Sequence, residues 1–233
     1  MSDGVMTLTL NRPEKLNAID NGLAQALLET IESAAADSAI RALLVRGNGR
    51  AFCAGRDVTE APTERDLVLV QAVATSLVRL DKPVLFAVHG WTVGAGLEWM
   101  LNADIVVAAS GSRFKFPEAS LGVFVTGGLS ATLPAYAGLS RAKALTLLGD
   151  EFGPEQACAW GLVWQVVALA DLETVSVQLA KRLAALQPPV VSRFKRVFNE
   201  VGLANFDRAV QLENEAQRSL SPRASPTGRD EKE

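Results

Sequence analysis

The chain has 233 residues, of which 48% are hydrophobic and 21% are charged, and this composition is typical of a globular protein with one large buried core. The 23 basic and 26 acidic residues give a net charge of −3, and no run of five Lys or Arg residues occurs. A nucleic-acid interface built on basic charge is therefore not expected.

Short apolar segments alternate with amphipathic ones over the first 120 residues. Residues 5–10 alternate and predict a strand that ends at Asn11-Arg12-Pro13, because proline cannot donate to a β-ladder. Helical spacing predicts one helix that begins at Asp20 or Asn21 and a second over 64–80. Further strands are predicted at 42–46, 84–88, 105–109 and 113–116. This alternation favours an α/β fold with buried, parallel strands.

The pattern becomes mostly helical after residue 127. Helices are predicted at 127–137, 140–148, 154–160, 171–186, 189–201 and 205–219, with a short strand at 162–167. The last segment, 221–233, is rich in Ser, Pro and charge, and we expect it to be disordered. The chain thus divides into an α/β core (1–167), a helical C-terminal region (168–220) and a tail (221–233).

Several common motifs are absent from the sequence. It has no GxxxxGK[ST], GxGxxG or GxSxG motif and no cluster of metal ligands, and its one histidine, His89, is expected to be structural. The N-terminus lacks the pattern of a signal peptide, and no apolar run reaches the roughly 18 residues of a membrane span. Cys53 and Cys158 show no CxxC spacing, so we expect reduced thiols and a cytoplasmic location.

Two segments share one design, in which a buried strand leads into a glycine-rich turn. In the first, ALLVR precedes GNGRAFCAGRD (47–57), and in the second, PVLFAV precedes HGWTVGAGLE (89–98). Glycine lets the main chain approach a ligand closely and expose N–H groups. The segments are either ordinary tight turns or the two halves of an oxyanion hole, in which two amides bind one oxygen.

Two acids stand among apolar residues on either side of the strand at 105–109. Glu98 follows the second turn, where a helix dipole would favour it, and Glu118 lies in FKFPEASLG (114–122), where a surface or capping role is the simpler interpretation. If both side chains reach one pocket, their different environments could make one an acid and the other a base.

Several motifs together resemble the enoyl-CoA hydratase/isomerase (crotonase) superfamily. NRPEKLNAI (11–19) resembles its N-terminal signature, and RAFCAGRDV (50–58) and KPVLFAVHGWTVGAGLE (82–98) resemble its two oxyanion-hole loops. DIVVAASGSRFKFPEASLG (104–122) is similar to the segment with the second catalytic acid, and GDEFGPEQACAWGLVWQVV (149–167) to the end of the catalytic core. The likeness covers roughly residues 5–220.

The resemblance implies a spiral of ββα turns with a helical C-terminal region used for trimer contacts. It implies that the amides of Arg56 and Ala95 hold the thioester oxygen of an acyl-CoA. It also implies that Glu98 activates water and Glu118 delivers a proton to the α-carbon. Contacts with the substrate and its CoA are implied for eight further residues: Lys15, Leu16, Ala18, Ala54, Asp57, Val58, Gly94 and Thr126.

The resemblance further implies a homotrimer or homohexamer in fatty acid metabolism, with CoA as part of the substrate and no separate cofactor. Three features depart from the family. Arg56 stands where glycine or alanine is common, so its side chain must point elsewhere, to a CoA phosphate or to an acid. Val125-Thr126 replaces a frequent Pro-Gly pair. Trp91 and Trp99 are large and either flank the acyl pocket or pack in the core.

The leading hypothesis is a 2-enoyl-CoA hydratase that uses both glutamates. On the same fold, a 3,2-enoyl-CoA isomerase would need one acid, and hydrolysis of a thioester or cleavage of a ring substrate is a third alternative. A non-catalytic RNA-binding or scaffolding homologue is a different class, which the two acids and the mildly acidic charge disfavour.

Overall fold

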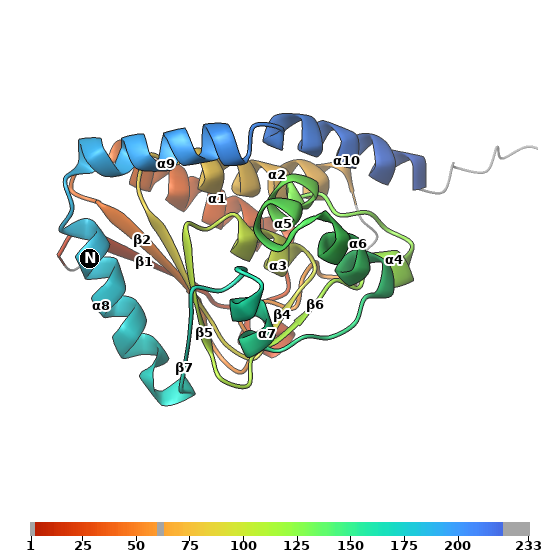
Figure 1. Cartoon of the computed structure of the whole chain (residues 1–233), viewed down its shortest axis with the longest axis horizontal. Coiled ribbons are helices and arrows are strands. Elements are labelled where there is room, and N and C mark those ends of the chain that lie inside the picture. Colours follow the sequence, from red (N-terminus) through yellow and green to blue (C-terminus); the bar gives the residue numbers. More distant parts are fainter. Residues whose placement is uncertain (1–2, 60–62, 221–233) are drawn as a thin grey trace, which may run out of the picture.

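The computed structural model describes residues 3–59 and 63–220, so the tail predicted to be disordered (221–233) lies outside the described residues (Figure 1). The strands are β1 (Val5–Leu10), β2 (Ala42–Gly47), β3 (Val84–Val88), β4 (Trp91–Val93), β5 (Ile105–Ala109), β6 (Arg113–Lys115) and β7 (Gln165–Val167). Two short 3-10 helices are η1 (Pro13–Lys15) and η2 (Leu169–Asp171). The α-helices are α1 (Asn21–Ala36), α2 (Glu64–Arg79), α3 (Ala95–Leu101), α4 (Glu118–Leu121), α5 (Leu129–Ala137), α6 (Leu139–Leu148), α7 (Pro154–Ala159), α8 (Leu172–Ala184), α9 (Pro188–Gly202) and α10 (Phe206–Leu220).

Five strands form one parallel sheet in the order β1-β2-β3-β5-β7. Leu44 of β2 lies between Thr7 of β1 and Leu85 of β3, which fixes the register at the centre of the sheet. All five residues of β3 are buried, which explains the uninterrupted apolar run at 84–88. Strands β4 and β6 form a separate parallel pair.

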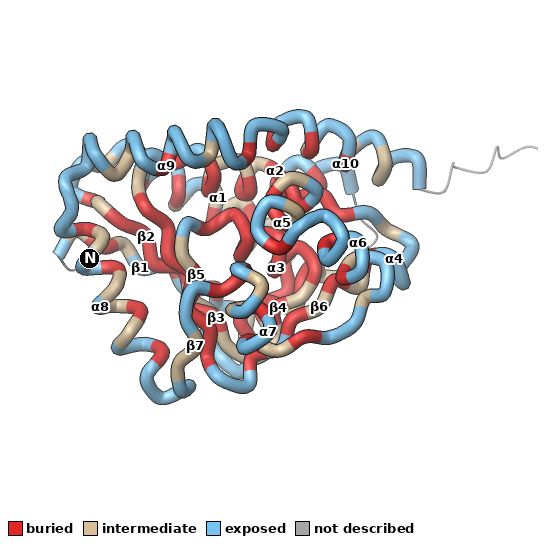
Figure 2. Tube along the Cα trace, viewed as in Figure 1, coloured by how far each residue is buried: buried red, intermediate tan, exposed pale blue. Residues whose placement is uncertain are grey.

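Helices cover both faces of the sheet. Leu43 and Val45 point to the face that packs with α1, α2 and α3, whereas Ala42 and Leu44 point to the face covered by α8. Figure 2 shows the buried residues concentrated in the strands and in the inner sides of these helices. The mixed α/β architecture, the parallel sheet and the helical C-terminal region predicted from the sequence are confirmed.

The predicted helices agree with the structure to within two residues at each end, and Asp20 is the residue that caps α1, accepting from Leu23 N at 2.7 Å. The strand predicted at 162–167 is shorter and begins at Gln165. Strand β4 was not predicted, because its three residues carry no periodicity and form a strand only by pairing with β6.

Helices α9 and α10 follow one another along one side of the molecule, over α1 and α2 (Figure 1). Lys195 of α9 reaches inward, and its ammonium lies 2.8 Å from Asp104 Oδ2 and 2.9 Å from Leu77 O. The same Asp104 oxygen accepts from Val84 N at the start of β3. One buried lysine thus fastens the C-terminal region to the sheet. No helix among residues 3–59 and 63–220 combines the length and apolar character needed to cross a bilayer.

Replacing Lys195 with Met should lower the free energy of unfolding by about 2 kcal/mol, because the methylenes are kept while charged hydrogen bonds to buried acceptors are lost. Urea denaturation at a fixed protein concentration measures the change. Lys181→Met is the control, since Lys181 pairs with Asp3 on the surface and should cost under about 1 kcal/mol. Equal effects of the two substitutions would contradict this account.

Candidate active site

The two glycine-rich turns predicted from the sequence lie against each other. Phe52 N donates to His89 O at 2.8 Å, and Cys53 N donates to Trp91 O at 3.1 Å. Cys53 O in turn accepts from Val93 N at 3.0 Å. The loop after β2 therefore pairs in parallel with β4, and both turns arrive at the same end of the molecule.

The backbone geometry directs the N–H groups of Arg56 and Ala95 away from the elements that neighbour them in the chain, so each can donate to another group. Ile19 N donates to Gly55 O at 2.7 Å, and Ile19 O accepts from Asp57 N at 2.9 Å. In such a parallel bridge the residue between the two bonded neighbours, here Arg56, directs its N–H away from the partner strand. Ala95 is the first residue of α3, where an N–H has no acceptor within the helix.

Glycines allow these segments to approach each other. A Cβ at Gly55, which has a φ of +88°, would lie 2.9 Å from Val93 O and 3.8 Å from Ala95 N. A Cβ at Gly94, with a φ of +50°, would lie 2.7 Å from Glu118 Oε1. A larger residue at either position would thus push the two segments apart or displace the carboxyl group. The arrangement can present two amides to one oxygen atom.

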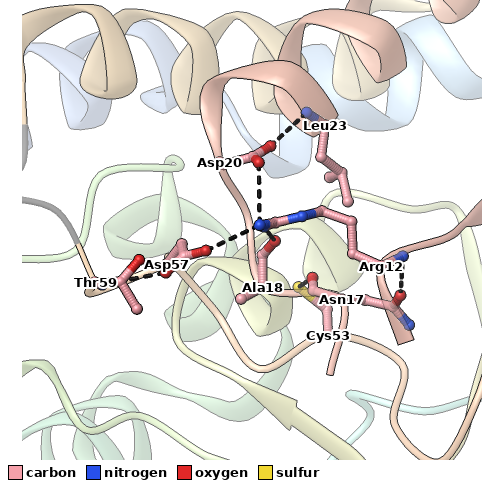
Figure 3. Close-up of polar contacts among 8 residues, drawn as sticks. All are labelled: Arg12, Asn17, Ala18, Asp20, Leu23, Cys53, Asp57 and Thr59. Carbon is pink, nitrogen blue, oxygen red and sulfur yellow. Dashed lines mark hydrogen bonds and ion pairs between the residues drawn. The ribbon is translucent and has the colours of Figure 1, made fainter. Parts of the chain in front are cut away.

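A network of polar contacts holds the first loop beside the segment that follows η1 (Figure 3). Arg12 Nη1 donates to Ala18 O at 2.6 Å, and Nη2 lies 3.1 Å from Asp57 Oδ2 and 3.2 Å from Asp20 Oδ2. Hydrogen bonds from Thr59, and then the contact with Arg12, lower the pKa of Asp57 to about 2. Asp57 is therefore a carboxylate that fixes the loop.

The side chain of Asn17 forms hydrogen bonds with the same loop. Its side-chain amide nitrogen lies 2.9 Å from the carbonyl oxygens of Asn48 and Ala51 and 3.1 Å from that of Phe52. Its oxygen accepts from Arg12 N at 2.8 Å (Figure 3). The side chain is fully buried and the backbone has a φ of +55°, a conformation that asparagine tolerates better than most residues. No local sequence pattern distinguishes Asn17, because its partners lie far along the chain.

Residues predicted to contact CoA lie on two adjoining segments. Leu16 O accepts from Ala54 N at 3.0 Å, which places the segments side by side. Lys15 and Val58 are exposed, whereas Ala18 is buried. The structure thus brings these predicted residues together, and Lys15 and Val58 are the ones among them that are open to solvent.

Glu98 lies in the first turn of α3 and is 2% exposed. Its Oε2 accepts from Thr126 N at 2.9 Å and from Gly127 N at 2.5 Å. Thr126 was predicted to contact the substrate, and in the structure its amide holds this carboxyl group. Burial, and then the negative charges of Glu118 and Glu213, raise the pKa of Glu98 well above its ordinary value, while the two amides act in the opposite direction.

Glu118 begins α4 and is also buried. Its Oε1 lies against Gly94, the N-cap of α3, and Glu98 stands in the first turn of the same helix. Burial raises the pKa of Glu118 to about 7. No group in residues 3–59 and 63–220 donates a hydrogen bond to its Oε2. Because the charge of Glu118 also raises the pKa of Glu98, the two buried groups do not both ionise easily near neutral pH.

The structure shows the surroundings of the three large side chains for which the sequence leaves alternatives, and it decides between them for Arg56 and Trp99. Arg56 Nη2 lies 3.1 Å from Asp66 Oδ1 on α2, so the guanidinium turns to an acid. Trp99 is buried, and its Nε1 donates to Val70 O at 3.0 Å, which is core packing. Trp91 is half-buried beneath the guanidinium of Arg113, 4.1 Å from the ring centroid.

The surroundings of His89 and Glu213 differ in character. The ring of His89 bonds to Gly49 O at 2.8 Å through Nε2, as expected for a structural histidine. Glu213 of α10 is fully buried and adds to the negative potential at Glu98, although its sequence pattern is that of a surface acid on an amphipathic helix. Within the described parts of the chain, no three His, Cys, Asp or Glu side chains gather as metal ligands would.

Comparison with known proteins gives a consistent result. Residues 1–227 match the family model described as enoyl-CoA hydratase/isomerase. The chain is 38% identical over 225 residues to the 1,2-epoxyphenylacetyl-CoA isomerase of Escherichia coli (strain K12), covering 92% of this chain and 86% of that protein. It is 34% identical over 201 residues to the 2,3-dehydroadipyl-CoA hydratase of the same organism, covering 84% and 78%.

Solved structures agree with the fold. An enoyl-CoA hydratase from Mycobacterium avium subsp. paratuberculosis K-10 superposes with a TM-score of 0.91 at 28% identity, covering 96% of this chain and 92% of that one. The Pseudomonas aeruginosa protein OdaA superposes with a TM-score of 0.88 at 30% identity, covering 96% and 92%.

The raised pKa of Glu118 predicts that this residue costs stability at alkaline pH. Because the folded state binds the proton more tightly than the unfolded state, stability falls as pH rises from about 4.5 to about 7. Glu118→Gln cannot ionise, so it should exceed the wild type in unfolding free energy by on the order of 2 to 3 kcal/mol at pH 8 and far less at pH 5. Urea denaturation at both pH values measures this, with the exposed Glu32→Gln as control; a pH-independent difference would refute it.

Proposed function

Because the chain belongs to the enoyl-CoA hydratase/isomerase family, we propose that it adds water across the 2,3 double bond of a 2-enoyl-CoA thioester. The observation that carries this proposal is a pair of buried carboxyl groups at the N-terminal end of α3, where Glu98 stands in the first turn and Glu118 lies against the N-cap Gly94. Water addition needs one group to take a proton from water and another to give a proton to carbon. The E. coli hydratase at 34% identity supports the same reaction class.

We assign the carboxylate to Glu98 and the proton to Glu118. Burial raises the pKa of both groups, but Glu98 accepts two backbone N–H groups, which favour its ionised form, whereas Glu118 Oε2 has no donor among the described residues. A pKa of about 7 keeps Glu118 substantially protonated near neutral pH. The pair therefore begins the reaction with one proton and one negative charge.

In the proposed step, Glu98 takes a proton from water as the water oxygen bonds to C3 of the enoyl group. The C2–C3 π electrons move toward the thioester oxygen, and Glu118 gives its proton to C2. The product is a 3-hydroxyacyl-CoA, and the shared proton has moved from Glu118 to Glu98. Exchange with solvent returns the pair to its starting state.

The thioester oxygen gains negative charge in this step, and we propose that the amides of Arg56 and Ala95 hold it. Removing one donor of an oxyanion hole typically raises the barrier by roughly 3 to 4 kcal/mol. The ion pair between the Arg56 side chain and Asp66 keeps the guanidinium on α2 while the backbone N–H remains available. CoA would extend along the segments of Lys15 and Val58, and no separate cofactor takes part.

Isomerisation of a double bond is the second candidate; the relative at 38% identity is named an isomerase, although its named substrate is an epoxide. One acid can move a proton between carbons, and Glu118, with its free Oε2, is placed for this role. In that reaction Glu98 would transfer no proton and would only carry a negative charge.

Glu98→Gln and Glu118→Gln should each lower kcat for hydration of crotonyl-CoA or a longer homologue by about 10²- to 10⁴-fold, with a small change in KM. Loss of the ultraviolet absorbance of the conjugated thioester measures the rate, and Glu32→Gln is the control. A wild-type enzyme that hydrates none of these substrates would refute the proposal. Full activity of one variant on a 3-enoyl-CoA, without hydration by any form, would establish isomerisation instead.

We also propose that the chain forms a homotrimer or homohexamer through its C-terminal helices. Apolar side chains on α9 are exposed in the single chain, and an exposed patch of this kind typically marks an interface. They are Val190, Phe194, Val197, Phe198 and Val201.

Phe198→Glu should weaken assembly, because a charge would be buried in the interface. Sedimentation velocity should give the mass of three or six chains for the wild type and a smaller species for the variant at low micromolar concentration. Glu32→Lys on α1 should sediment as the wild type. A wild-type monomer would overturn the proposal.

A further inference from the structure

We infer that Glu213, on α10, is a positioning residue for Glu98, because it holds the backbone turn whose amides bind the Glu98 carboxyl group. This inference deepens the proposed function and rests on it for the role of Glu98 in the reaction. Glu213 is expected to touch neither the substrate nor the attacking water, and its effect would pass through the chain at 126–128.

Three consecutive amides are divided between two buried carboxyl groups. The N–H groups of Thr126 and Gly127 donate to Glu98 Oε2, and that of Gly128 donates to Glu213 Oε2 at 2.7 Å. Successive amides that point to anions form a rigid concave turn. Because the peptide group between Gly127 and Gly128 is planar, fixing the N–H of Gly128 also fixes the orientation of the carbonyl group of Gly127.

The other oxygen of Glu213 anchors the start of α5. Glu213 Oε1 accepts from Ser130 N at 2.7 Å and from Ser130 Oγ at 2.6 Å. The N-cap of α5 is Gly128, which has no side chain to satisfy these amides, so a carboxyl group from another helix supplies the acceptor. The hydrogen bonds to both oxygens offset part of the cost of burying Glu213, and burial still raises the pKa of its carboxyl group.

Further contacts from α10 fix the turn on either side of Gly127. Phe124 N donates to Gln217 Oε1 at 2.6 Å, and the ring of Phe206 lies so close to Gly128 that a Cβ there would collide with it. From the core side, Asn102 Nδ2 donates to Gly127 O at 2.9 Å. The turn that holds Glu98 therefore has its position set by α10 and α3 together.

A positioning role predicts an effect on the chemical step rather than on CoA binding, because the hydrogen bonds of Glu213 go to Gly128 and Ser130, on a segment other than those of Lys15 and Val58. In Glu213→Gln the amide group would face backbone N–H donors, and the turn would lose at least one acceptor. The matched control is Glu215→Gln, two residues along α10, where the side chain is exposed.

The experiment is a double-mutant cycle between Glu213→Gln and Glu98→Gln, read as kcat and KM for the wild type's best enoyl-CoA. We expect Glu213→Gln to lower kcat about 10- to 100-fold with KM changed less than about 3-fold. In the Glu98→Gln background it should lower kcat by less than about 2-fold. An equal loss in both backgrounds, or no loss in either, would overturn the inference.

Thermal unfolding shows whether the Glu213→Gln variant is folded. If it is not, Ser130→Ala replaces it in the same cycle. This substitution removes only the hydroxyl donor, so the expected loss of kcat is smaller, about 2- to 5-fold.

A measurement without substrate separates this inference from the proposed function. Amide hydrogen exchange of the peptide that spans 123–130 should be at least 10-fold faster in Glu213→Gln than in Glu215→Gln, because the turn opens locally. If the wild type hydrates no enoyl-CoA yet exchange accelerates, the proposed reaction fails while the anchoring of the turn stands. Unchanged exchange overturns the anchoring itself.

Discussion

Burial of two carboxyl groups beside each other is the constraint on which the site depends. A carboxylate removed from water needs hydrogen-bond donors or a proton, and burial raises the pKa of both Glu98 and Glu118. The amides of Thr126 and Gly127 favour the ionised form of Glu98, whereas no group among the described residues donates to Glu118 Oε2. In the proposed reaction this difference suits Glu98 to accept a proton and Glu118 to give one, and the raised pKa of Glu118 costs the fold stability at high pH.

In the proposed reaction, backbone amides rather than cationic side chains stabilise the charge that develops on the substrate. The fold must therefore fix the positions of the loops that carry these amides. Asn17 and Arg12 fix the loop that carries the Arg56 amide, through contacts with carbonyl oxygens and with Asp57 (Figure 3). The turn at Thr126 is fixed in the same way from α10. Rigid donors of this kind need little rearrangement when charge develops on a substrate.

The sequence predicts the parallel sheet and nearly every helix, because burial on both faces leaves uninterrupted apolar runs and amphipathic periodicity is strong in α2 and α8. It also selects Glu98 and Glu118 from their apolar neighbours. It does not reveal Glu213, since QLENEAQ contains two acids on an amphipathic helix and only tertiary packing decides which is buried. Asn17 is hidden for a similar reason, because its partners lie on a loop more than 30 residues away.

The central claim, that the two acids add water to a double bond, is tested most directly by isotope labelling of the product. The wild-type enzyme would convert a 2-enoyl-CoA in water labelled with both deuterium and oxygen-18. The account predicts a 3-hydroxyacyl-CoA with one solvent oxygen at C3 and one deuteron at C2. Deuterium in recovered or isomerised enoyl-CoA, without incorporation of solvent oxygen, would contradict it.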